Sequence, residues 1–281
     1  MKITSVDLSS DNANIFSFSL QEASPTDKYF VKTIIGLDAD EIVSKFHAFS
    51  LQSKYKYFNF VLPKRDIIMR IGLNPNYALN ESPSDIRDEL YRAIAASRLG
   101  VVDLLFNGGG SVQAKISGFI TKFEVPYFSK EAELQITIKC IDPVFRGFSP
   151  VTLESGELGT SNPFYIADSI STAPHGFAFN CTITGTIADF VIQDQASNPE
   201  WYFNVTPFGG FLNGDQLFFS SEYGNRYLYM IRSGVTTPLL DRIDPTSIWP
   251  TIFPGANEFH FTRMGSFTWG ELTFYPTYWG I

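Results

Sequence analysis

Apolar and polar residues alternate along most of this chain, and this alternation predicts β-strands. In residues 16–20 and 133–140 every second side chain is apolar, which gives a strand one dry and one wet face. Turn residues separate these runs from their neighbours and predict an extended hairpin system in the first half. We expect an antiparallel β-sandwich there, with further strands at residues 29–37, 42–51, 55–62, 66–73, 101–106 and 112–127.

One segment of the first half has a helical pattern instead. Residues 82–85 read Ser-Pro-Ser-Asp, which supplies an N-cap serine, a proline in the first turn and an early acidic residue. Ile86, Leu90 and Ile94 then recur every four residues and form one apolar stripe. The sequence predicts a single amphipathic helix over about 83–99 that docks this stripe on a sheet.

The second half contains strand signals only. Short alternating runs are separated by glycine- and asparagine-rich turns. Several short strands within about a hundred residues favour a sandwich of the jelly-roll type. The expected strands cover residues 177–183, 187–193, 201–206, 216–220, 226–232, 258–262 and 267–275.

Length and charge divide the chain into two domains. It has 281 residues, which is about twice the usual size of one domain. Residues 1–142 contain 16 Lys/Arg and 17 Asp/Glu, whereas residues 143–281 contain 5 and 12, no lysine and all four tryptophans. We expect a first domain over 1–142, a turn-rich connection over 143–174 and a second domain over 175–281.

Composition excludes several classes of function. The net charge of −8 argues against tight nucleic-acid binding, which needs clustered basic residues. The sequence lacks an apolar run of about 18 residues and a signal-peptide pattern, so we expect no membrane insertion and synthesis in a cytoplasm. Cys140 and Cys181 lie in alternating runs and are interpreted as buried free thiols.

Polar motifs give little support for catalysis, a cofactor or a metal. His47, His175 and His260 lack the spacing of metal ligands or of a catalytic pair, and a structural role is the expected one. Gly108–Gly110 lacks the continuation of a phosphate-binding loop and is interpreted as a hairpin tip.

Two acidic groups, Asp38/Asp40/Glu41 and Asp241/Asp244, follow or precede turn residues and are interpreted as caps of backbone amides. A glycosidase acting through Asp241 and Asp244 is the weakest alternative, because such enzymes need two carboxylates at a set separation that a sequence does not define.

Exposed aromatic side chains suggest a second kind of site. Trp201, Tyr202 and Trp249 are the residues we select for stacking on a glycan or contacting a partner. The opposing interpretation is that these aromatic residues fill the core of the sandwich, as alternating aromatics on a strand usually do.

Three segments resemble the distal tail protein (Dit) family of siphophages, the bacteriophages with long flexible tails. Residues 138–147 are similar to the strand and Asp-Pro junction that closes the first domain of that family. Residues 249–259 resemble its Pro-Gly-x-Asn loop ahead of a late strand, and residues 272–281 resemble its closing strand. The resemblance covers both domains in the same order.

The resemblance implies a structural, non-enzymatic protein of the virion, assembled in the host cytoplasm. It implies a homo-hexameric ring between the tail tube and the tail tip or baseplate, with the first domain around a channel for DNA. The second, galectin-like domain would point outward. The implied partners are the tail tube protein and the tail-tip hub or tail-associated protein, with tape-measure and receptor-binding proteins as further neighbours. The alternative function is a carbohydrate- or receptor-binding module of a phage tail.

A closed ring needs one edge of the first domain to match the opposite edge of its neighbour. We expect unpaired strand edges to supply this contact, with the hairpin over 101–141 as the contacting element. If both borders of the sheet in the first domain were paired within the same molecule, subunits could not join into a ring by pairing their strand edges. The residues selected for the ring contact are Asn107, Gly108, Gly109, Gly110, Phe119 and Phe123.

Overall fold

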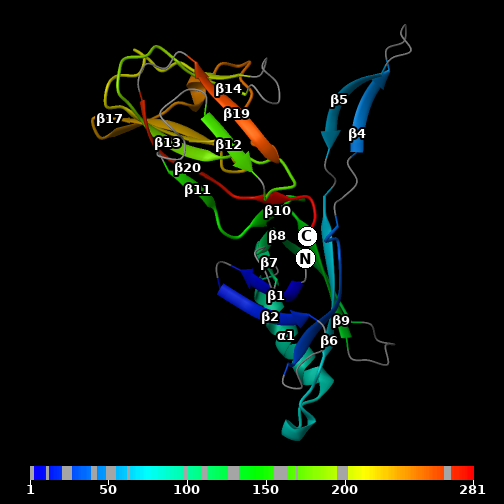
Figure 1. Cartoon of the computed structure of the whole chain (residues 1–281). Coiled ribbons are helices and arrows are strands. Elements are labelled where there is room, and N and C mark those ends of the chain that lie inside the picture. The colour runs from blue at the N-terminus through cyan, green and yellow to red at the C-terminus, as the bar shows by residue number, and fades with distance from the viewer. Residues whose placement is uncertain are drawn as a thin grey trace. The chain divides into compact units, whose positions relative to one another are not determined.

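The computed structural model contains two compact units, which are described separately (Figure 1). The first unit comprises Met1–Phe148 and Tyr278–Ile281, and the second comprises Ser149–Thr277. The structure describes residues 3–10, 13–20, 27–38, 43–48, 55–61, 64–97, 100–108, 113–125, 133–154, 164–168, 170–194, 202–262 and 267–281.

A seven-stranded sheet in the first unit closes on itself. Its strand order is β8-β7-β1-β2-β3-β6-β9, and β9 pairs again with β8. All neighbours are antiparallel except β2 and β3, which are parallel. The expected sandwich is therefore wrong, because one sheet forms a mixed barrel with the core inside it. The strands are β1 (Ile3–Ser10), β2 (Ala13–Leu20), β3 (Tyr29–Ile35), β6 (Asp66–Leu73), β7 (Val102–Gly108), β8 (Ala114–Glu124) and β9 (Glu133–Cys140).

The long strand β8 makes the closure. Its first residues pair with the short strand β10 (Phe145–Gly147), and its part from Gly118 onward pairs with β9. At Gly118 a Cβ atom would lie 2.6 Å from the carbonyl oxygen of Lys139, so glycine permits the close approach of the two strands there. The strand β21 (Thr277–Tyr278) extends the sheet beyond β10.

The predicted helix is confirmed as α1 (Pro83–Ser97), preceded by the 3₁₀ turn η1 (Tyr77–Leu79). Ser82 caps it reciprocally with Asp85: the Asp85 amide donates to Ser82 Oγ, and the Ser82 amide donates to the Asp85 carboxylate. The stripe Ile86, Leu90 and Ile94 is buried in the barrel core. Tyr29 on β3 donates a 2.8 Å hydrogen bond to the Ile86 carbonyl and ties helix to sheet.

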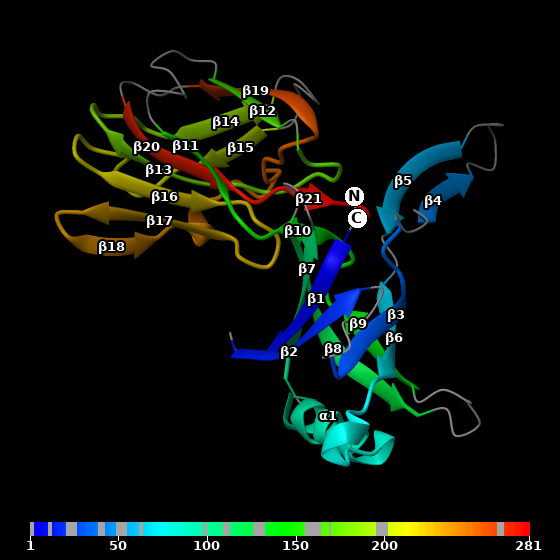
Figure 2. The same cartoon turned by 60° about the horizontal axis from the view of Figure 1, so that its bottom comes forward.

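A separate two-stranded sheet completes the first unit. It consists of β4 (Val43–Ala48) and β5 (Tyr55–Val61), paired antiparallel from Val43↔Val61 to Ala48↔Tyr55. Figures 1 and 2 show it apart from the sheet of the barrel. We call this pair of strands the ribbon. Both strands match predicted strand segments.

The second unit is a pair of antiparallel sheets around one aromatic-rich core. The buried side chains of both sheets belong to a single cluster that includes Phe177, Phe190, Phe203, Phe219 and Phe259, which agrees with the expected β-sandwich. The six-stranded sheet has the order β11 (Val151–Glu154), β20 (Phe267–Phe274), β13 (Ala178–Ile183), β16 (Gln216–Ser220), β17 (Tyr227–Arg232) and β18 (Val235–Pro238). The four-stranded sheet has the order β12 (Phe164–Asp168), β19 (Gly255–Thr262), β14 (Phe190–Asp194) and β15 (Tyr202–Val205).

The second half differs from the expectation in the additional strand β18 (Val235–Pro238) and in the following features. The strands β10, β11 and β12 lie within residues 143–174, where the sequence analysis expects a turn-rich connection. A 3₁₀ turn, η2 (Leu240–Arg242), interrupts the strands after β18. The new strands are three to five residues long, too short for a clear alternation of apolar and polar residues.

Candidate functional site

The hairpin expected to form the ring contact has no free border within the barrel. β8 is paired with β7 on one side and with β10 and β9 on the other, and β9 is also paired with β6. The expectation of strand pairing through the edge of this hairpin is therefore wrong. The physical reason is barrel closure, which uses the main-chain groups of both borders internally.

An apolar patch nevertheless lies on the outer face of β8 and its neighbours. Phe119 pairs with Lys139 and its side chain is 43% exposed. The register of β7 and β8 brings Val101, 41% exposed, beside Phe119. Ile141, 56% exposed, follows β9 and donates its amide to the Ser117 carbonyl. We call Val101, Phe119 and Ile141 the β8 patch.

The other selected ring residues are engaged inside the unit or lie elsewhere. The Asn107 side-chain amide donates to Ser5 Oγ at 3.3 Å and to Asp7 at 2.7 Å, and Gly108 pairs with Ile3. Gly109 and Gly110 lie outside the described residues. Phe123 packs edge-on against Tyr91 of α1, with ring centroids 5.2 Å apart.

The ribbon has unpaired strand edges. Among the described residues, β4 and β5 pair only with each other, so each strand presents one free edge of amide and carbonyl groups. An isolated two-stranded sheet is at best marginally stable in water. The sequence of the ribbon is rich in aromatic residues, with Tyr55, Tyr57, Phe58 and Phe60 on β5.

The aromatic residues selected for glycan stacking pack partly against the core of the second unit. The Trp249 ring packs 4.9 Å from Phe203 and 5.6 Å from Phe219, and the Arg226 guanidinium lies 5.1 Å from its centroid. Tyr202 is 39% exposed and bonds Thr246 through its hydroxyl at 2.8 Å. Trp201 lies outside the described residues. Trp249 therefore has little free ring face for a sugar.

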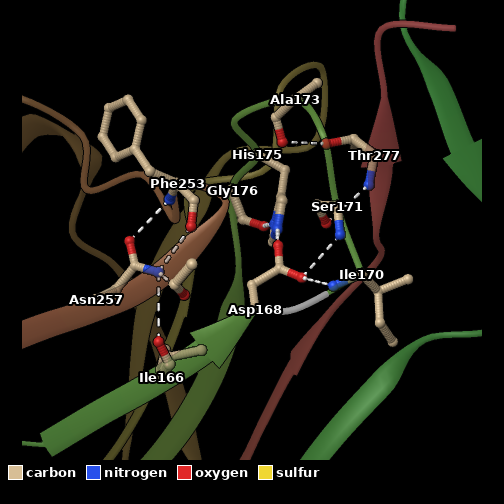
Figure 3. Close-up of polar contacts among 11 residues, drawn as sticks. Ile166, Asp168, Ile170, Ser171, Ala173, His175, Gly176, Phe253, Asn257 and Thr277 are labelled. Atoms are coloured by element: carbon tan, nitrogen blue, oxygen red, sulfur yellow. Dashed lines mark hydrogen bonds and ion pairs between the residues drawn. The ribbon is translucent and has the colours of Figure 1, made fainter.

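A buried polar cluster lies at the end of β12 (Figure 3). Asp168 accepts bonds from the amides of Ile170 and Ser171 at 3.1 and 3.0 Å, and from His175 Nε2 at 2.8 Å. The side chains of Asp168 and His175 are only 1% and 5% exposed. We call Asp168, Ser171, His175 and Thr277 the polar clamp, since Thr277 donates its amide to Ser171 Oγ at 3.2 Å.

The pKa of Asp168 reflects two opposing effects. Burial of the carboxyl group raises the pKa, whereas the hydrogen bonds from Ser171, His175 and Ile170 lower it. The hydrogen bonds prevail, and the pKa of Asp168 lies below its ordinary value. The carboxylate is therefore the form that the folded protein stabilises.

The clamp contains serine, histidine and aspartate, but its connectivity differs from that of a catalytic triad. In a triad the serine hydroxyl bonds the histidine, which in turn bonds the aspartate. Here both Ser171 and His175 bond Asp168, and the second ring nitrogen of His175 contacts the Gly176 carbonyl at 3.0 Å. His175 also stacks on Phe274 at 4.9 Å. The arrangement holds loops together and is structural.

The Pro-Gly-x-Asn loop has a structural role beside this clamp. Asn257 is 3% exposed, accepts the Phe253 amide at 2.8 Å and donates to the carbonyls of Phe253 and Ile166 (Figure 3). Gly255 has φ +103°, a conformation that favours glycine. The asparagine thus closes the loop that leads into β19.

The remaining polar candidates also serve local structure. Asp244 accepts the amide and hydroxyl of Thr246 at 2.8 and 2.5 Å, and these bonds hold the pKa of Asp244 below its ordinary value. His260 contacts Glu258 at 2.7 Å. Cys140 and Cys181 are buried free thiols, as expected. In the described ranges there is no cluster of three or more metal-ligating side chains, and no helix is long and apolar enough to cross a membrane.

Comparison with solved structures assigns the fold. The fold of this chain is similar to that in the crystal structure of the distal tail protein (Dit) of phage SPP1. That match has a TM-score of 0.64 at 13% identity and covers 97% of this chain and 98% of that one. A chain of the phage p2 baseplate matches with a TM-score of 0.46 at 8% identity, covering 96% and 97%. No family model and no curated protein sequence matches this chain. The chain therefore has the distal tail protein fold over both units.

Proposed function

We propose that this protein is the distal tail protein of a long-tailed phage, a non-enzymatic subunit of the hub that joins the tail tube to the tail tip or baseplate. The observation that carries the proposal is the structural match to SPP1 Dit over nearly the full length of both chains. A match confined to one unit would support only a common domain, whereas here both units recur in the same order.

The proposed assembly is a ring of six copies around a channel. A ring needs a heterologous contact that closes, in which two different surfaces of one subunit meet the complementary surfaces of its two neighbours. The ribbon and the β8 patch are two such surfaces, because both expose groups that favour burial. We propose that the ribbon of one subunit docks on the β8 patch of the next, with Phe119 at the contact.

The proposed neighbours follow from this position in the tail. The ring would bind the tail tube protein on one side and the tail-tip hub or tail-associated protein on the other, near the tape-measure and receptor-binding proteins. Residues 1–142, which would surround the channel, contain 16 Lys/Arg and 17 Asp/Glu, so this domain has no excess of basic groups that would hold DNA. The second, galectin-like unit would point outward.

Electron microscopy and mass measurement of the purified full-length protein test the proposal. We expect negative-stain images of rings with a central hole, and a mass near six times the 31.5 kDa chain, or about 190 kDa. Strictly monomeric protein at high concentration that also fails to bind tail tube protein would contradict the proposal.

Truncating Phe119 tests the ring contact itself. We expect Phe119→Ala to weaken each subunit contact by about 2 kcal/mol, or about 30-fold, since buried aromatic anchors dominate interfaces. The ring-to-monomer ratio, measured by mass photometry over a dilution series, should fall accordingly. Tyr77→Ala is the matched control, because Tyr77 is 73% exposed in the first unit and lies away from the patch.

Replacing the ribbon with a short linker is the complementary test. No strand of the barrel pairs with β4 or β5 within the described residues, so the barrel should still fold. We expect a folded monomer by circular dichroism and chromatography. Rings that persist both without the ribbon and with Phe119→Ala would place the contact elsewhere.

A further inference from the structure

The outer face of the six-stranded sheet carries a row of side chains that the core does not use. In β13, β16 and β17, alternate residues such as Cys181, Leu217 and Leu228 are buried in the sandwich core. The intervening residues therefore project from the opposite face. The register aligns Asn180 with Phe218 and Phe218 with Tyr229 across these three strands. Figure 2 shows the three strands side by side.

Aromatic rings occupy one end of this row. Phe218 and Tyr229 stack with centroids 4.9 Å apart and planes 9° apart, and Tyr227 lies 5.7 Å from Tyr229. All three side chains are half-buried although they lie outside the core. The face thus presents a compact apolar strip that includes two tyrosine rings.

Amide side chains occupy the other end of the row. Asn180 lies over Gly270, where a Cβ atom would be 1.7 Å from Asn180 Oδ1, so the glycine makes room for this amide. Gln216 is exposed two residues before Phe218 on the same face. In the described part of the chain neither amide group has a hydrogen-bond partner. Each can both donate and accept.

Among the described residues that project from this face, none is basic. The rows through Asn180 and Gln216 continue to Pro238 and Thr236 on β18 and contain no Lys, Arg, Asp or Glu. The acidic residues nearest to these rows in the described part of the unit are Glu222, beyond Tyr227, and Glu271, exposed on β20 beside Gly270. An anionic ligand would therefore find no compensating charge here.

We propose that this face of the second unit binds a neutral glycan across Asn180, Phe218 and Tyr229. A pyranose has an apolar C–H face that packs on aromatic rings and hydroxyl groups that bond amides and phenols. Asn180 and Tyr229 are two strand spacings apart, or about 10 Å, which accommodates two linked sugar rings. The site is distinct from Trp249 and does not depend on ring assembly.

A protein partner is less well matched to this row. A stable protein interface buries about 800 Å² on each side and needs a broad surface. The apolar strip here consists of three rings beside two unpartnered amides, which is the mixture of stacking surface and directed hydrogen bonds that a sugar requires.

A glycan array with the full-length protein tests the proposal. The probes are neutral oligosaccharides built from glucose, galactose, rhamnose and N-acetylglucosamine, with acidic glycans on the same array. We expect the protein to bind at least one neutral glycan. We do not expect a binding pattern that is restricted to acidic glycans. Titration of the best ligand should show about tenfold weaker binding for Tyr229→Ala and for Asn180→Ala, with Tyr229→Phe within about threefold of wild type.

Tyr223→Ala is the matched control, since Tyr223 is 80% exposed in a turn of the same unit. Its affinity should equal that of wild type, and circular dichroism should show that every variant folds. The proposal is overturned if no neutral glycan binds, if only acidic glycans bind, or if Tyr229→Ala binds as well as Tyr223→Ala. Because a monomer can bind the glycan, this result is separable from the ring measurement.

Discussion

Asp168→Ala is expected to lower the free energy of unfolding by about 3–5 kcal/mol, because removing a buried carboxylate leaves its buried hydrogen-bond donors unsatisfied. Asp168 and His175 are both nearly inaccessible to water, and their atoms Oδ2 and Nε2 are 2.8 Å apart. The substitution also removes the acceptor for the amides of Ile170 and Ser171. We expect this destabilisation to affect mainly the second unit, which contains both residues.

Urea unfolding monitored by tryptophan fluorescence measures this effect, since Trp201, Trp249 and Trp269 belong to the second unit and only Trp279 to the first. Asp241→Ala is the matched control, since the Asp241 side chain is 67% exposed and should cost less than about 0.5 kcal/mol. If Asp168→Ala and Asp241→Ala unfold at the same urea concentration, the polar clamp contributes nothing to stability.

The pH dependence of stability reports on the same carboxylate. A pKa that is lower in the folded than in the unfolded protein stabilises the fold above the unfolded pKa of about 4, and the stabilisation is lost as pH falls through the folded pKa. We expect the stability difference between wild type and Asp168→Asn to shrink below about pH 4. A constant difference from pH 7 to pH 2.5 would show that the Asp168 carboxylate is not responsible.

Arg65→Met is the second substitution with a large expected effect, about 3 kcal/mol or more, because charged hydrogen bonds inside a protein are worth about 1.5–3 kcal/mol each. Arg65 is 2% exposed. Its guanidinium donates to the Gly36 carbonyl at 3.1 Å and to the Trp279 carbonyl at 2.5 Å, and lies 4.6 Å from the Phe145 ring centroid. Methionine keeps much of the volume but leaves both carbonyls without this donor.

The Arg65 variant should also release the end of the chain. Tyr278–Ile281 returns to the first unit, where the Ile281 amide bonds the Leu37 carbonyl at 3.0 Å. Hydrogen exchange at these residues should accelerate in Arg65→Met and stay unchanged in Arg87→Met, whose exposed side chain pairs with Asp88 at 2.8 Å. Unchanged exchange in both variants would show that Arg65 does not anchor this segment.

Local signals predicted the individual elements well. The helix α1 could be placed because its cap and its four-residue apolar spacing are encoded in adjacent residues. The strands of the barrel and the ribbon were placed from alternation, with ends shifted by a few residues. The strand β1 (Ile3–Ser10) was missed, because three of its eight residues are serine and its apolar positions are few.

The polar clamp was not predicted, although each of its residues is visible in the sequence. His175 was interpreted as structural, but its partner Asp168 comes from the end of β12, a strand that the sequence analysis did not expect. The link to Thr277 spans more than a hundred residues. No local spacing rule identifies such a partner. The same holds for Arg65, whose acceptor at Trp279 is 214 residues away.

The sequence by itself determined that the chain is rich in β-strands and contains one capped helix. It also determined that the chain has two regions of different charge, with enough apolar residues to form a core in each region. Only the tertiary structure decided that the first sheet closes into a barrel, since closure depends on pairing between β8 and both β7 and β9. Alternation shows which face of a strand is buried but not which strand lies beside it. For that reason the hairpin edge is paired within the barrel, and the ribbon and the outer β8 patch are the surfaces that we propose for the ring contact instead.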